Sequence, residues 1–158
     1  MYALPYRMFS ARATQGLMEL ICLAVQYGLK DDMLRILVIE DSPVNMALTV
    51  AILENAGHTV LQADHAFEGI ETARREQPDL VLMDIQLPDL DGLAATRMLK
   101  ADPRTAKLPV IAITAFAMKG DEDDTRAAGC DGYVTKPIRY KEFLAEVDAV
   151  LKRRAERA

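Results

Sequence analysis

The sequence has few of the residues that cross-link a chain or bind zinc. Two of its 158 residues are cysteines, Cys22 and Cys130, and two are histidines, His58 and His65. The cysteines are far apart and outside any metal-ligand spacing. Because small secreted domains usually pair many more cysteines, a disulfide scaffold and a zinc module are both disfavoured. The two thiols are expected to be reduced, as is typical of a cytoplasmic protein.

The chain also lacks a basic excess and a long apolar run. It has 19 Lys and Arg against 24 Asp and Glu, a formal net charge of −5, whereas nucleic-acid binders usually carry a basic stripe. A membrane-spanning helix needs about 20 apolar residues, and the nearest candidate, residues 17–29, is interrupted by Glu19 and Gln26. No small-residue cleavage site follows it, which disfavours a secretory signal. We therefore expect a cytoplasmic globular protein with no integral membrane segment and no nucleic acid partner.

What the sequence does contain is a regular alternation of strand and helix patterns from Met33 onward. Short apolar runs at residues 34–39, 80–84 and 110–114 are typical of strands that are buried on both faces of a parallel sheet. Weaker strands are predicted over residues 59–63 and 132–135. Helices are predicted over residues 43–56, 66–76, 93–100 and 119–128, with a last helix that includes residues 143–151. This alternation predicts a flavodoxin-like α/β fold, a doubly wound parallel sheet with strand order 2-1-3-4-5.

The first of these helices has a clear start and a predicted apolar face. Ser42 is a candidate N-cap and Pro43 stands at the first helical position, where its missing N–H does no harm. The spacing i, i+3, i+4, i+7, i+8 predicts which side chains face the sheet, namely Val44, Ala47, Leu48, Ala51 and Ile52.

Charged and polar residues follow the predicted strands where each one ends: Glu40 and Asp41, Asp84, Thr114, and Lys136-Pro137. In a doubly wound sheet the ligand site lies outside the carboxyl ends of the strands, so these side chains are expected to converge. Clustered carboxylates repel unless a cation neutralises them, and oxygen ligands suit Mg²⁺. Each carboxylate alone could be a surface group or a helix cap, but the full set favours a functional site.

In this order and spacing, residues 33–154 resemble a response-regulator receiver domain, the phospho-acceptor module of two-component signalling. The resemblance rests on Ile39-Glu40-Asp41, VLMDIQLP at 81–88, Asp91-Gly92, ITA at 113–115 and GYVTKP at 132–137. The chain is most similar to stand-alone receivers of the DivK type or to receivers of hybrid kinases. The expected organisation is an N-terminal extension over 1–32, either helical or an incorrectly assigned start, a receiver domain over 33–154, and a charged tail over 155–158.

The resemblance implies roles for the carboxylates. Asp84 would be the phosphorylated aspartate. Asp41 would bind Mg²⁺ directly together with Asp84, and Glu40 would hold the ion through water. The main-chain carbonyl of Gln86 would complete the protein ligands.

The resemblance also implies a switch. Thr114 would be the switch hydroxyl, and the Lys136 ammonium would pair with the phosphoryl group. Tyr133 would be the switch aromatic; the less favoured alternative is a half-buried tyrosine of an edge strand with no switching role. Pro137 would follow a cis peptide bond at Lys136, which proline makes accessible.

A signalling module, rather than an enzyme with an external substrate, is the function that this resemblance implies. Its phosphoryl donor would be a histidine kinase or a histidine phosphotransfer protein. Its output would be a downstream protein target, bound through the face made by the fourth helix, fifth strand and last helix, where a homodimer would also form.

Two other functions on related sheets remain as alternatives. An aspartyl-nucleophile phosphohydrolase would place Asp-x-Asp after the first strand, whereas this chain has Glu40-Asp41-Ser42. A flavodoxin-like cofactor binder would need a phosphate-cradling loop there, and an acidic loop would repel phosphate without a metal.

Overall fold

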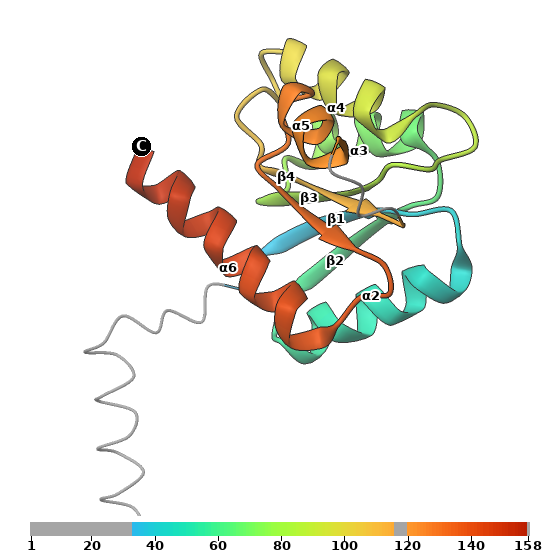
Figure 1. Ribbon diagram of the computed structural model, residues 1–158, viewed down its shortest axis with the longest axis vertical. Helices are drawn as coiled ribbons and strands as arrows, with labels where there is room; N and C mark the ends of the chain where they lie inside the picture. The colour runs from blue at the N-terminus through green and yellow to red at the C-terminus, as the bar shows by residue number, and fades with distance from the viewer. Residues whose placement is uncertain (1–32, 116–119, 158) are drawn as a thin grey trace, which may run out of the picture. The chain divides into compact units, whose positions relative to one another are not determined.

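Five parallel strands form one sheet in the order β2-β1-β3-β4-β5 (Figure 1). The structure is a computed structural model and describes residues 33–115 and 120–157. The strands are β1 (Arg35–Ile39), β2 (Thr59–Ala63), β3 (Leu80–Asp84), β4 (Val110–Thr114) and β5 (Gly132–Thr135). The helices are α2 (Pro43–Asn55), α3 (Ala66–Glu76), α4 (Gly92–Ala101), α5 (Asp121–Ala127) and α6 (Tyr140–Arg157). The predicted fold class and strand order are confirmed.

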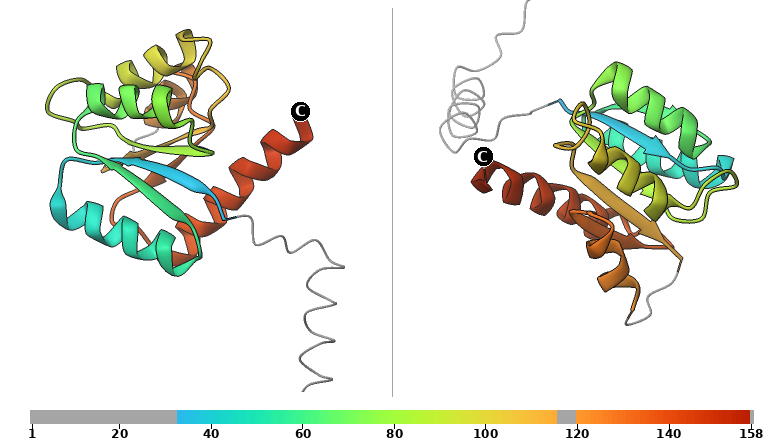
Figure 2. Two further views of the ribbon diagram at one scale, coloured as in Figure 1. Left: turned by 180° about the vertical axis from the view of Figure 1, so that it is seen from behind. Right: turned by 90° about the horizontal axis from the view of Figure 1, so that it is seen from above.

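Helices cover both faces of the sheet (Figure 2). On one face, α2 and α6 pack against alternate residues of the central strands, with Phe143, Val147 and Val150 of α6 buried. On the other face, α3 and α4 pack against the remaining alternate residues. Because β1, β3 and β4 are covered from both sides, nearly every residue in them is buried. The half-exposed edge strands β2 and β5 are the two that the sequence shows only weakly.

Helix α2 starts as predicted but presents a different face to the sheet. The Ser42 hydroxyl accepts a hydrogen bond from the Asn45 N–H at 3.4 Å, and Pro43 is the first helical residue. The buried residues are Met46, Thr49, Ile52 and Leu53. Of the predicted face only Ile52 is buried; Val44, Ala47, Leu48 and Ala51 are exposed. The prediction was wrong because this helix is apolar almost all round, so periodicity does not fix its rotation.

The last helix extends beyond the predicted end of the receiver domain at residue 154. α6 continues to Arg157, so residues 155–157 extend the last helix rather than form a separate tail. The expected N-terminal extension over 1–32 and the first predicted residue of the helix over 119–128 lie outside the described residues. Among the helices that the structure describes, none has the length and apolar character needed to cross a membrane.

Candidate functional site

Three carboxylates from two neighbouring strands meet at the carboxyl edge of the sheet. Ligand atoms of Glu40, Asp41 and Asp84 all lie within 4.8 Å of one another. Glu40 and Asp84 are each 2% exposed, whereas Asp41 is exposed to solvent. Two buried acids beside a solvent-facing one form an acidic site that is open on one side.

Strand register explains why these residues converge. Ile39 of β1 pairs with Met83 of β3, so the next residues along the two strands, Glu40 and Asp84, are neighbours. Thr114 closes β4 and pairs with Thr135 of β5, which places Lys136 directly after that pair. Parallel strands end at the same edge, so a fixed register gathers residues that are far apart in the sequence.

Lys136 binds both buried carboxylates. Its Nζ lies 2.9 Å from Glu40 Oε2 and 2.9 Å from Asp84 Oδ2. Its backbone N–H donates to the Thr114 carbonyl at 2.7 Å, and the peptide bond to Pro137 is cis, as the resemblance implied. The ammonium is therefore held at the centre of the site by the strand end that carries it.

The pKa values of the buried pair reflect burial and pairing. Burial raises the pKa of Glu40, the Lys136 hydrogen bond offsets part of that rise, and repulsion from Asp84 adds to it. Burial alone would lower the pKa of Lys136, but its hydrogen bonds to Asp84 and Glu40 outweigh burial and raise it. Lys136 consequently stays charged at neutral pH and is the resident counter-ion of the two acids.

Backbone N–H groups orient the two buried carboxylates. Ser42 N–H donates to Glu40 Oε1 at 3.1 Å, and Gln86 N–H donates to Asp84 Oδ1 at 3.0 Å. Each acid therefore has one oxygen held by the backbone and the other paired with Lys136, through an ion pair in Glu40 and a hydrogen bond in Asp84. Three carboxylates with one ammonium leave an excess of negative charge. This donor set of oxygens fits a hard divalent cation such as Mg²⁺.

Glycine is required where α4 begins beside the site. A Cβ on Gly92 would lie 2.1 Å from the carbonyl oxygen of Asp84 and 2.7 Å from the Cα of Ile85. The Gly92 N–H donates to the Ile85 carbonyl at 2.9 Å. The start of α4 therefore rests directly on the backbone of Asp84.

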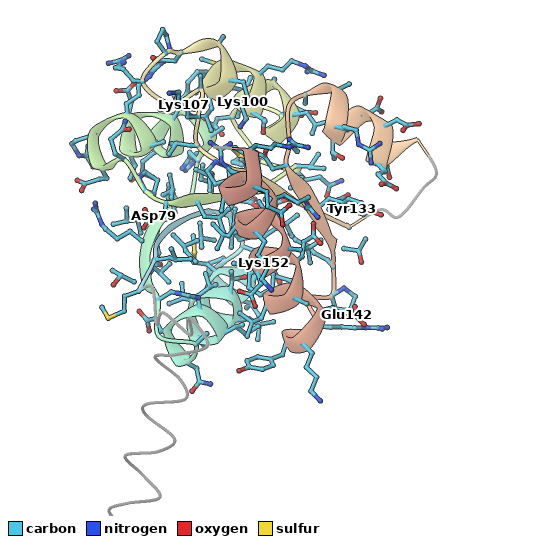
Figure 3. The ribbon with its side chains drawn as sticks, turned by 90° about the vertical axis from the view of Figure 1, so that its left-hand side faces the viewer. Asp79, Lys100, Lys107, Tyr133, Glu142 and Lys152 are labelled. Atoms are coloured by element: carbon cyan, nitrogen blue, oxygen red, sulfur yellow. The ribbon has the colours of Figure 1, made fainter. Side chains whose placement is uncertain are left out.

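The two predicted switch residues lie in different environments. Thr114 is 4% exposed at the end of β4. Tyr133 is 37% exposed, and its hydroxyl lies 3.5 Å from Glu122 Oε2 on α5. Figure 3 shows Tyr133 at the surface beside α6. The geometry does not test the switch itself, which stays a prediction.

A second group of ligand-type side chains, Asp64, His65 and Glu68, lies exposed between β2 and α3. The Glu68 carboxylate accepts from the Asp64 N–H at 3.4 Å, a contact typical of a helix start. The hydrogen bond to Asp64 raises the pKa of His65. Their contacts are accounted for by the helix start and the His65–Asp64 pair.

Sequence reasoning missed one residue of the loop beside the site that contacts helix α3. The carboxylate of Asp89, in the loop after β3, accepts hydrogen bonds from the first two N–H groups of α3. No local pattern could have shown this, because the partners precede Asp89 by 22 and 23 residues.

Comparisons with known proteins show the family of this chain. Residues 36–148 match the model of the response regulator receiver domain. The chain belongs to this family. The polar-differentiation response regulator DivK of Brucella anthropi is 41% identical over 116 residues, covering 73% of this chain and 94% of the relative. DivK of Brucella ovis has the same identity and coverage.

Two solved receiver domains are similar to this chain in sequence and fold. The receiver domain of the sensor histidine kinase PA1611 from Pseudomonas aeruginosa PAO1, with magnesium coordinated in its active-site cleft, is 36% identical with a TM-score of 0.66, covering 76% of this chain and 95% of that one. A CheY-like receiver domain protein from Methanospirillum hungatei JF-1 is 27% identical with a TM-score of 0.73, covering 80% of this chain and all of that one. The receiver domain is thus that of a response regulator in phosphorelay signalling, and the phosphohydrolase alternative gains no support.

Proposed function

We propose that this receiver domain accepts a phosphoryl group on Asp84 from a phosphohistidine. The observation that carries the proposal is the environment of Asp84. It is a buried carboxylate with an ammonium 2.9 Å from one oxygen and two further acids whose ligand atoms lie within 4.8 Å. A carboxylate oxygen of Asp84 would attack phosphorus, the P–O bond would form as the P–N bond breaks, and the imidazole would leave.

Magnesium is the cofactor that the donor set fits. Asp41, Asp84 and the main-chain carbonyl of Gln86 would hold the ion directly, and Glu40 would hold it through water. When bound, it supplies the charge neutralisation that phosphoryl transfer requires. The magnesium in the PA1611 receiver supports this assignment.

The protein's own groups position and neutralise the reacting phosphoryl group. Lys136 stays protonated and already contacts Asp84, so it can pair with a phosphoryl oxygen without moving far. After transfer, the Thr114 hydroxyl would donate to another phosphoryl oxygen. The new charge would therefore draw the ends of β4 and β5 toward the acyl phosphate.

Partner choice would follow from a change at the α5-β5-α6 face. Movement of Thr114 would vacate space that Tyr133 fills, which repacks this face. A hollow of about 530 Å³ lies there, and its lining includes Tyr133, Glu122, Arg126 and Arg153. We propose this face for the downstream protein target and for a phosphorylation-dependent homodimer.

The phosphodonor itself needs a surface beside Asp41, and α2 offers one. Val44 is 78% exposed and Leu48 is 47% exposed on a helix that starts two residues after Asp41. Exposed apolar residues beside a reactive site are typical of a protein contact surface. We propose that a helix of the histidine kinase or histidine phosphotransfer protein packs there.

Phosphorylation by acetyl phosphate tests the chemistry without a partner. Intact protein should gain one phosphoryl group by mass only when Mg²⁺ is present. Asp84→Asn should gain none, whereas the control Asp79→Asn, at the other end of β3, should gain the same as wild type. A gain that persists in Asp84→Asn, or no gain in wild type, would overturn the proposal.

The donor surface has its own test. Val44→Asp and Leu48→Asp should slow transfer from a phosphorylated histidine phosphotransfer protein. The same variants should be labelled by acetyl phosphate at the wild-type rate, because the small donor needs no docking surface. Equal slowing with both donors would show damage to the site instead.

A further inference from the structure

Helix α3 begins without a cap of its own. His65 stands at the N-cap position, and its side chain makes no capping hydrogen bond. The first N–H groups of a helix have no partner within the helix and need an acceptor from elsewhere. The Asp89 carboxylate supplies it: Oδ1 accepts from Ala66 N–H at 2.9 Å, and Oδ2 accepts from Phe67 N–H at 3.0 Å.

Asp89 belongs to the loop that follows the phospho-acceptor. That loop runs from Ile85 to Asp91 and contains Gln86, whose N–H donates to Asp84 Oδ1. At its far end, Asp91 caps α4 by accepting from the N–H groups of Leu93 and Ala94. The loop is therefore fixed to α4 by one aspartate and to α3 by another.

The contact with α3 falls in the middle of this loop. Leu87 and Leu90 pack against the core beneath α3 and α4, but apolar packing does not fix the direction of a carbonyl group. Within the described part of the chain, the two Asp89 hydrogen bonds are the hydrogen bonds that join this loop to α3. Two charge-assisted bonds from one carboxylate define both position and orientation.

We propose that Asp89 is a positioning residue that holds the Gln86 carbonyl in place for Mg²⁺ by tying its loop to the start of α3. The inference rests on the proposed magnesium site. Groups that orient metal ligands change metal affinity when they are removed, although they touch no metal. Asp89 acts through two intervening residues, Leu87 and Pro88, so we expect its effect on Mg²⁺ affinity at the lower end of the roughly 10- to 100-fold range seen for such groups.

The test measures Mg²⁺ affinity by isothermal titration calorimetry on the full chain, and thermal stability in EDTA. Asp89→Ala should weaken Mg²⁺ binding about tenfold. The matched control is Asp79→Ala, which removes a carboxylate that accepts from the Arg35 N–H at 2.8 Å at the opposite end of β3. Asp79→Ala should lower the melting temperature by about as much as Asp89→Ala does, but it should leave the Mg²⁺ affinity unchanged.

Asp89→Asn separates positioning from charge and remains useful should the alanine variant not fold. Asparagine keeps one acceptor oxygen for the helix start but loses the negative charge. Affinity close to wild type in Asp89→Asn supports positioning. A loss as large as in Asp89→Ala would show a purely electrostatic effect, and wild-type affinity in Asp89→Ala would also overturn the inference. Absence of Mg²⁺ binding by wild type would instead refute the proposed function.

Discussion

Replacing Gly92 with alanine should damage both stability and the site. The added Cβ would meet the Asp84 carbonyl oxygen at 2.1 Å and two further backbone atoms within 3 Å. Since the obstructing atoms belong to the backbone, no side-chain rotation can relieve the clash. Overpacking of this kind typically destabilises a protein by about 1–3 kcal/mol. Because β3 or α4 itself must shift, we expect a destabilisation at the upper end of this range, with a fall in Tm of roughly 10 °C.

The assay pairs urea unfolding with acetyl phosphate labelling. Gly120→Ala is the matched control, because a Cβ on Gly120 would have no atom of the described residues within 4 Å. The control should change the free energy of unfolding by less than about 0.5 kcal/mol, and it should be labelled normally. Gly92→Ala should be labelled more slowly than its unfolded fraction explains, since the clash displaces Asp84. An unfolding free energy equal to that of the control would refute the argument.

Three other substitutions test separate parts of the molecule. Thr49→Val should raise the free energy of unfolding by about 1 kcal/mol, because the buried Thr49 hydroxyl has no partner among the described residues; a fall in urea denaturation would contradict this. Hydrogen bonds from the side chain and backbone of Arg104 hold the pKa of Asp102 below its ordinary value. The stabilisation by ionised Asp102 is complete above the ordinary pKa of an aspartate and is lost as the pH falls toward its lower pKa in the folded protein. The difference in unfolding free energy between wild type and Asp102→Asn should therefore shrink between about pH 4 and pH 2. A difference that stays constant over this range would contradict the role of Asp102. Lys136→Ala should still be phosphorylated but should lose the NMR shift change of Tyr133 that accompanies phosphorylation in wild type, and an unaltered change would exclude Lys136 from the switch.

Exposed residues of α2 show where sequence patterns reach their limit. The helix start at Ser42 and Pro43 was predicted correctly, because capping depends on neighbours along the chain. The buried face was not, because a helix with apolar residues on several sides can dock in more than one rotation. The rotation that buries Met46 instead of Val44 is decided by the sheet beneath it.

The amino-acid sequence alone determined the order of strands and helices and the residue types at each strand end. Buried parallel strands read as apolar runs, and the acids, hydroxyl and ammonium that follow them are visible without coordinates. Only the tertiary structure decided which of those groups touch. The register of β1, β3 and β5 brings Lys136 to 2.9 Å from both Glu40 and Asp84, and the path of the loop after β3 carries Asp89 to the start of α3. These contacts join residues more than 20 positions apart, so they depend on the packed sheet and not on any local pattern.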